Sequence, residues 1–78
     1  GMVLLGIVET DDLPAAAKLL EDRHDVPPDL LYLDESRDRL EVAPWVLEDL
    51  AALLPFRCYL VEEYPTADRL EVERQPLN

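Results

Sequence analysis

Apolar and polar positions follow two different periods along the chain, and the changes of period divide it into elements. Residues 2–8 form a short continuous apolar run, which predicts a buried strand. Over residues 12–23 the apolar positions recur at helical spacing, behind a Thr10-Asp11-Asp12 cap and with Pro14 in the first turn, which predicts a helix. Apolar or alternating runs bounded by turn residues predict four further strands, at 30–34, 39–43, 57–63 and 69–74.

A second helix is predicted between the strands at 39–43 and 57–63. Pro44 suits the first helical position, and Pro55 would end the helix. Its buried stripe would consist of Val46, Leu47, Leu50, Leu53 and Leu54.

An internal repeat underlies this order of elements. Residues 38–42 and 68–72 both have the sequence Asp-Arg-Leu-Glu-Val, with a period of 30 residues. The similarity extends upstream, where Leu20 aligns with Leu50 and each copy follows an apolar run. The repeat indicates one α-β-β unit that is used twice after a lone first strand.

The resulting order, β-α-β-β-α-β-β, resembles the ferredoxin-like fold with one strand added at the C-terminus. The resemblance rests on the element order alone and covers one small α+β domain at 2–75, followed by a tail at 76–78. It implies a two-layer α/β sandwich in which two helices cover one face of an antiparallel sheet and the first strand is central. Acylphosphatases, regulatory amino-acid-binding domains and RNA-recognition domains share this fold, so it implies no particular function.

Three of the predicted strands carry apolar residues on both faces. Where one face of a sheet packs on helices and the other meets water, strands should alternate, and those at 2–8, 30–34 and 57–63 do not. We therefore expect apolar surface on the face away from the helices, and such a surface is typical of an interface. The candidate interface residues are Leu4, Tyr32, Tyr59, Val61 and Trp45, the last as an interface anchor or as the edge of the core.

Length and cysteine content favour the same interpretation. A chain of 78 residues buries only about 60% of the surface that its unfolded form exposes, so small domains often need a disulfide, a metal or oligomerisation. The single cysteine, Cys58, excludes an internal disulfide, and with the single His24 it is too little for a zinc site. We therefore expect a homo-oligomer or a protein partner.

The charge limits the class of partner. Eighteen acidic and seven basic residues give a net charge of −11, which argues against nucleic acid and anionic membranes as partners. The longest apolar run is too short to span a bilayer, and one unpaired cysteine fits a reducing compartment, so we expect a cytoplasmic protein. One lysine against six arginines, abundant proline and scarce thermolabile residues suggest an archaeal-like, thermophilic or salt-adapted source, and a GC-rich genome explains the arginine bias equally well.

No residue pattern predicts catalysis, a cofactor or a metal. The acidic turn at 34–38 lacks the glycine and glutamate of a calcium loop, and Asp11-Asp12 is explained by helix capping. His24 is typical of a helix C-terminus, and Cys58 lies among apolar strand residues. The chain is therefore interpreted as a non-catalytic interaction module, a homodimer or an accessory subunit.

Two other functions stay open at this point. The first is a small-molecule or metal-ion-binding protein that uses acidic loops at Asp11, Asp12, Asp34 and Asp38. The second is a nucleic-acid mimic that acts through the charge of −11.

Overall fold

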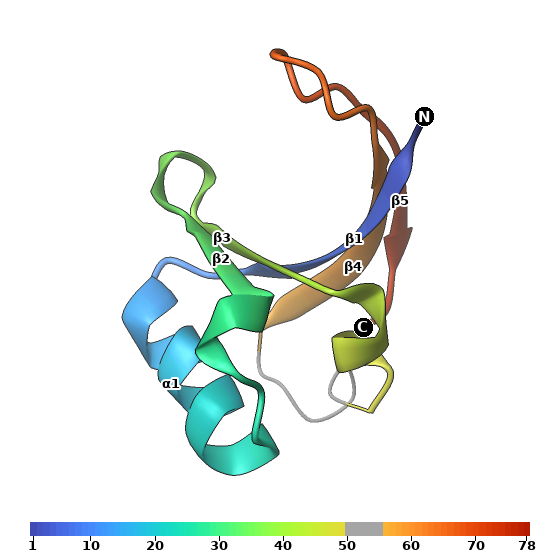
Figure 1. The fold of residues 1–78 in the computed structure, drawn as a ribbon. Coiled ribbons are helices and arrows are strands. Elements are labelled where there is room, and N and C mark those ends of the chain that lie inside the picture. The colour runs from blue at the N-terminus through green and yellow to red at the C-terminus, as the bar shows by residue number, and fades with distance from the viewer. Residues whose placement is uncertain (50–55) are drawn as a thin grey trace.

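The computed structural model describes residues 1–49 and 56–78, and in these segments it consists of one curved antiparallel sheet and one α-helix (Figure 1). The strands are β1 (Val3–Glu9), β2 (Leu31–Asp34), β3 (Arg39–Val42), β4 (Arg57–Glu63) and β5 (Glu71–Pro76). The helix is α1 (Leu13–His24), and three short 3-10 helices are η1 (Pro28–Leu30), η2 (Glu35–Arg37) and η3 (Pro44–Leu47). The strand order across the sheet is β2-β3-β1-β4-β5, so β1 is central.

The predicted fold class, with the order β-α-β-β-α-β-β and two helices, is wrong. In place of the second helix, Pro44 begins the 3-10 helix η3, in which the amide of Val46 donates to the carbonyl oxygen of Ala43 (3.0 Å) and that of Glu48 to Trp45 (3.3 Å). Aromatic and β-branched residues at Trp45 and Val46 have low helix propensity, and hydrogen bonds from i to i+3 produce a tighter turn than an α-helix. The remaining predicted helical positions, 50–54, lie outside the described residues.

Helix α1 forms as predicted because both of its ends are capped. The Asp12 carboxylate accepts a hydrogen bond from the amide of Ala15 (3.2 Å), and Pro14 lies in the first turn. At the other end Asp25 adopts a left-handed conformation (φ 53°), and the amide of Val26 donates to the carbonyl oxygen of Leu20 (3.1 Å).

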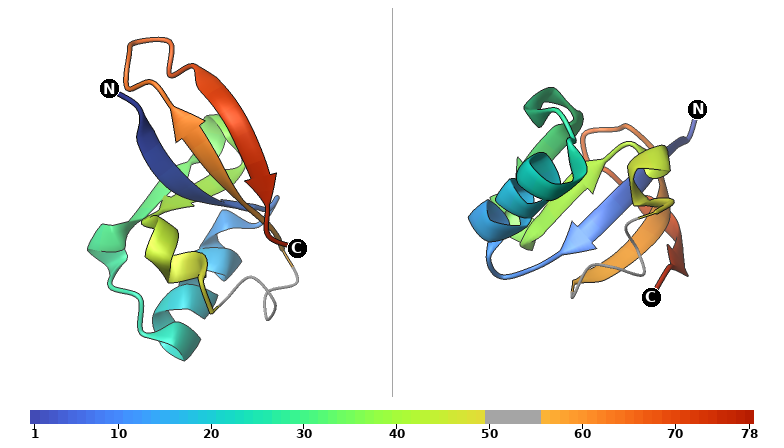
Figure 2. Two further views of the ribbon diagram at one scale, coloured as in Figure 1. Left: turned by 90° about the vertical axis from the view of Figure 1, so that its right-hand side faces the viewer. Right: turned by 90° about the horizontal axis from the view of Figure 1, so that it is seen from below.

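The main core lies between the sheet and the layer formed by α1 and η3, which both pack on the same face of the sheet (Figure 2). Its buried residues come from six segments of the chain: Val8, Leu13, Ala16, Leu20, Val26, Leu40, Val42, Val46, Leu47 and Cys58. Gly6 makes the close approach of η3 to β1 possible, because a Cβ there would lie 2.9 Å from side-chain atoms of Leu47 and Val42.

The two edges of the sheet differ in character. Edge strand β5 contains Glu71, Glu73, Arg74 and Pro76, and its pairing with β4 is interrupted by a bulge next to Glu62/Glu63. Edge strand β2 has the sequence Leu-Tyr-Leu-Asp and pairs regularly with β3. Charges, prolines and bulges protect a free edge from pairing with another strand, so β5 is protected and the apolar part of β2 is not.

Candidate interaction surfaces

The face of the sheet opposite α1 carries a second, smaller apolar cluster. Ile7, Tyr59 and Val61 are buried there, with Leu5 packed against them. The sheet curves so that the β2–β3 turn and the β4–β5 loop rise on either side of this face (Figure 1). Charged side chains of the same chain cover the cluster, including Arg74, whose guanidinium carbon lies 4.7 Å from the centre of the Tyr59 ring.

Arg39 lies at the centre of this charged layer. Its side chain is only 2% exposed, and it donates a hydrogen bond to a carboxylate oxygen of Glu71. Its guanidinium is also 3.5 Å from carboxylate oxygens of both Glu41 and Glu63. Burial is the largest single influence and lowers the pKa of Arg39, but the hydrogen bond to Glu71, the attraction of that carboxylate and the contribution of Tyr59 together raise it, so the cation stays charged.

In this charged layer, the two copies of the internal repeat form ion pairs with each other. Arg39 of the first copy pairs with Glu71 of the second. Arg69 of the second copy donates to Glu41 of the first, at 2.6 and 2.7 Å to its two carboxylate oxygens. Both arginines also contact Glu63 on β4, at 3.5 Å from Arg39 and 2.9 Å from Arg69. The repeat therefore supplies two matched halves of one network that joins the β2–β3 hairpin to the β4–β5 loop.

The rim of the network is formed by the β2–β3 turn. A hydrogen bond from Ser36 lowers the pKa of Asp34 below its usual value, and although burial opposes this, Arg37 at 2.8 Å adds to the lowering. Burial is the largest single influence on Glu71 and would raise its pKa, but the hydrogen bonds and positive charges of Arg39 and Arg74 together outweigh burial, so this pKa is also lowered. Permanently charged guanidinium groups and strongly acidic carboxylates hold charge in place and do not transfer protons near neutral pH. We therefore interpret the network as a structural layer over the second apolar cluster.

The five predicted interface residues do not form one surface. Tyr59 and Val61 lie on the predicted face, away from α1, but they are already buried within the single chain. Tyr32 on β2 is 58% exposed and belongs to the same face by its register opposite Glu41. Leu4 is 48% exposed and lies on the other face of the sheet, the one on which α1 packs. Trp45 is 62% exposed in η3.

Sequence reasoning missed the network residues Arg39, Glu41, Glu63, Arg69 and Glu71. The signal that could have identified them was the repeat itself, since its arginine and glutamate recur at matching positions.

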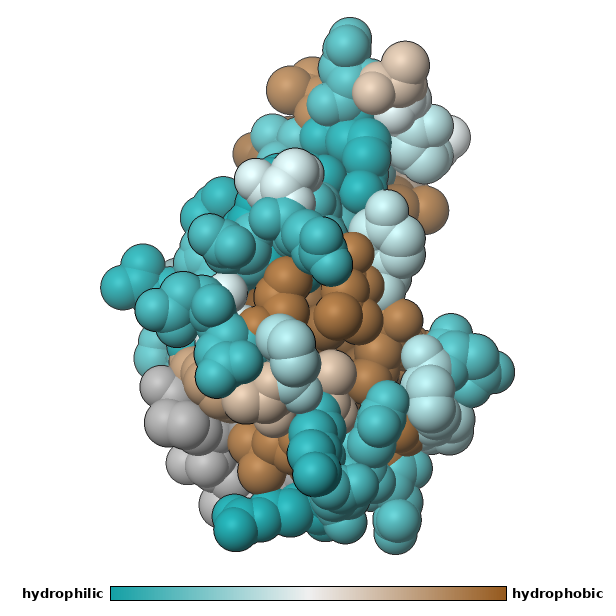
Figure 3. Space-filling view, turned by 90° about the vertical axis from the view of Figure 1, so that its left-hand side faces the viewer, coloured by the Kyte–Doolittle hydropathy of each residue, from teal (hydrophilic) through white to brown (hydrophobic). Residues whose placement is uncertain are grey.

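The apolar edge strand β2 is the first surface that a partner could use. Within it, Leu33 is 40% and Tyr32 is 58% exposed, on opposite faces of the strand. The space-filling view of the side on which α1 and β2 lie shows apolar surface at its centre, framed by hydrophilic residues (Figure 3). Solvent-exposed apolar surface next to an unprotected strand edge is typical of an association site.

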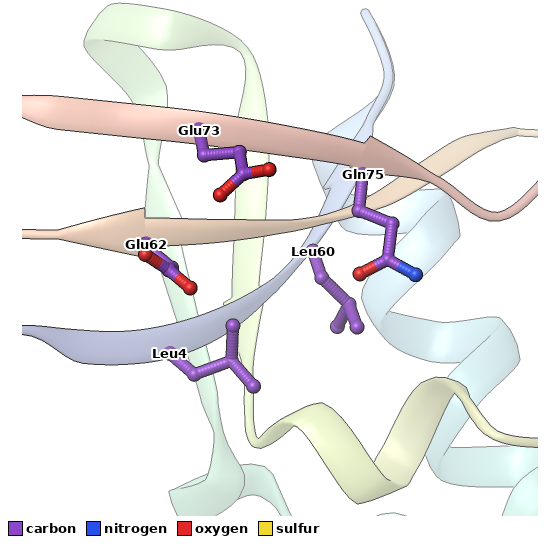
Figure 4. Close-up of a pocket in the computed structure, with 5 residues that line it drawn as sticks. All are labelled: Leu4, Leu60, Glu62, Glu73 and Gln75. Atoms are coloured by element: carbon purple, nitrogen blue, oxygen red, sulfur yellow. The ribbon is translucent and has the colours of Figure 1, made fainter.

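A groove of about 270 Å³ forms a second surface near the β5 edge of the sheet, away from β2. Its walls are Leu4, Leu60, Glu62, Glu73 and Gln75. Their side chains project from β1, β4 and β5 on one side of the sheet (Figure 4). Leu4 is paired with Glu62, and Glu62 with Glu73, so these three residues form one row across three strands.

Three of the four acidic positions considered as ligand sites have local structural roles. Asp12 caps α1, Asp34 pairs with Ser36 and Arg37, and Asp38 occupies a left-handed turn position (φ 50°). In the described segments no group of three His, Cys, Asp or Glu side chains is arranged to hold a metal ion.

Cys58 is buried, and this burial raises the pKa of its thiol. None of the helices in residues 1–49 and 56–78 is long and apolar enough to cross a bilayer.

Comparison with known proteins places the chain in a family. Residues 1–77 match the family described as a domain of unknown function (DUF8061), so the chain belongs to that family. A protein of Methanocaldococcus jannaschii, provisionally named a glycyl-radical enzyme activating enzyme, is 34% identical over 87 aligned positions. The alignment covers 99% of this chain and 22% of the relative, so the chain spans about a fifth of that protein's length. No solved structure matches the chain.

Proposed function

We propose that this chain is a small non-catalytic interaction module that associates with a second copy of itself through edge strand β2. The observation that carries the proposal is the contrast between the two edges of the sheet. Strand β5 has charges, a proline and a bulge, whereas the first three residues of β2 are Leu31, Tyr32 and Leu33. A free edge with apolar side chains on both faces is a template for pairing with another strand.

A second copy is the occupant that this edge fits best. Two β2 strands related by a two-fold axis would pair antiparallel, so each contact would occur twice and one short strand would supply both halves of the interface. Pairing would satisfy the free backbone groups of β2, and each hydrogen bond is worth about 0.5–1.5 kcal/mol. The exposed surfaces of Tyr32 and Leu33 would become buried on the two faces of the joined sheet.

The relative from M. jannaschii supports an accessory role for the module. The matched segment makes up 22% of a protein whose name describes an activating enzyme, so most of that chain lies outside the segment. We propose that modules of this family accompany a catalytic part and contribute association, not chemistry.

The test is the mass in solution of the wild type and of two lysine variants. Light scattering should give about twice the mass of the 8.9 kDa chain at micromolar concentrations in 1 M KCl, where the Debye length is about 3 Å and repulsion is screened. Leu33→Lys should give a folded monomer, because a charge at the centre of the interface would lose its hydration. Val72→Lys is the matched control, since Val72 is 52% exposed in β5, the other edge strand, and the charge change is the same.

A wild type that is monomeric at 100 µM would refute the proposal. So would a Leu33→Lys variant that keeps the dimeric mass. Added positive charge reduces the net repulsion of a chain at −11, so loss of the dimer in Leu33→Lys could not be attributed to long-range electrostatics.

A further inference from the structure

The groove at the β5 side of the sheet lies on the same face as α1 but beyond the elements that cover that face. Helix α1 packs on β3, and η3 packs on β1. Leu4 is 48% exposed and Leu60 is half-buried, and both line the groove. In Figure 4 both leucines project into the groove beside the carboxylates of Glu62 and Glu73. The groove therefore combines two leucine side chains with two acidic groups.

The two glutamates are placed unfavourably for an isolated chain. Glu62 and Glu73 are direct partners in the β4–β5 ladder, and like charges directly opposite each other in a sheet are destabilising. On the opposite face Glu41, Glu63 and Glu71 all contact arginines. Within residues 1–49 and 56–78, no basic side chain forms an ion pair with Glu62 or Glu73, so four arginines compensate one face and none compensates this pair.

We propose that the groove binds an arginine side chain of a partner protein. Its guanidinium would lie between the carboxylates of Glu62 and Glu73, which removes their repulsion and forms charge-assisted hydrogen bonds. The aliphatic stem would lie on Leu4 and Leu60, as the stems of long cationic side chains do on apolar surface. Gln75 adds an amide oxygen at the rim.

Size and shape favour one side chain over a free metabolite. A volume of about 270 Å³ falls below the range of roughly 300–1,000 Å³ that is usual for small-molecule sites. Arginine fits better than lysine, because its planar fork can contact two carboxylates at once. The surface is separate from edge strand β2, so the inference goes beyond the proposed homodimer and identifies a second partner of basic chemistry.

The probe for this site is N-acetyl-arginine amide, titrated into isotope-labelled protein at low salt and followed by NMR. We expect saturable shifts centred on Leu4, Glu62 and Glu73, with a dissociation constant in the millimolar range, about 4 kcal/mol of binding. Glu73→Gln should weaken binding at least fivefold and should not lower the melting temperature, because it removes a like-charge contact. N-acetyl-lysine amide should bind at least twofold more weakly.

Glu35→Gln is the matched control, since Glu35 is exposed in η2 and the charge change is identical. Equal weakening by Glu35→Gln and Glu73→Gln would overturn the inference, because attraction would then be a general effect of the acidic surface. Saturation of the groove by calcium at lower concentration than by the arginine amide would also overturn it, in favour of a cation site. The dimeric mass of Glu73→Gln separates the two proposals, since a persisting dimer without arginine binding removes only this one.

Discussion

Replacement of Arg39 by methionine tests whether the charged layer stabilises the fold. Methionine keeps an unbranched apolar stem, so the main loss is the cation. The side chains of Arg39 and Glu63 are 2% and 3% exposed, so the variant leaves a carboxylate without its buried partner. Glu71 loses its hydrogen bond from Arg39 at the same time.

The expected loss is a large part of the total stability. Removal of one partner from a buried ion pair typically costs about 3–5 kcal/mol. A chain of this length has about 4–12 kcal/mol of stability, at roughly 0.05–0.15 kcal/mol per residue. Arg39→Met should therefore lower the melting temperature by roughly 10 °C or more.

Two further variants make the measurement specific. Arg69→Met should cost only about 1–2 kcal/mol, because its side chain is 32% exposed and water can replace part of what is lost. The double variant Arg39→Met/Glu63→Met should recover at least half of the loss, since replacement of a whole buried pair by apolar residues is often neutral.

Urea unfolding followed by far-ultraviolet circular dichroism, at one fixed protein concentration, gives the free energies of unfolding. If Arg39→Met cost no more than Arg69→Met, burial would not determine the strength of this network and the reasoning would be refuted.

Two other predictions concern stability at acidic pH and the packing around Gly6. The pKa values of Asp34 and Glu71 are lowered in the folded state, so their contribution is present at neutral pH and is lost as the pH falls through these lowered values. Urea unfolding should show a free energy of unfolding that declines below about pH 4.5, the ordinary pKa of glutamate, and this decline should be shallower in Glu71→Gln. An equally steep decline in the variant would count against the network. Gly6→Ala should cost about 1–3 kcal/mol, because the added methyl group would press on Leu47 and Val42. Gly1→Ala is its control, with nothing within 4 Å of the added atom, and equal melting temperatures for the two variants would contradict the packing argument.

The strands and the first helix were predictable because local signals define them. Continuous or alternating apolar runs gave five strands close to the observed bounds, and the Asp12 cap with Pro14 located α1. The segment after Pro44 was not predictable in the same way. Its apolar spacing fits an α-helix, but spacing does not report whether the turn that begins at Pro44 closes with i to i+3 or i to i+4 hydrogen bonds.

The surfaces were harder to predict than the strands. Alternation placed Tyr59 and Val61 correctly on the face away from α1, but a face that is apolar in sequence can be covered by charged residues of distant segments. Arg39 and Glu71 are separated by 32 positions in the chain, and their contact depends on the curvature of the sheet. The facing of Glu62 and Glu73 likewise depends on the register of β4 with β5, which includes a bulge.

The unequal edges of the sheet also determine how far the proposed self-association would proceed. A sheet with two open edges could add copies at both ends and grow into a filament. Here the bulge, the charges and Pro76 protect the β5 side, which leaves β2 as the less protected edge of the described sheet. In the proposed homodimer, pairing of two β2 strands would use the open edge of both copies and would give a continuous sheet of ten strands with a protected strand at each end. In the proposed homodimer, assembly through β2 would therefore stop at two copies.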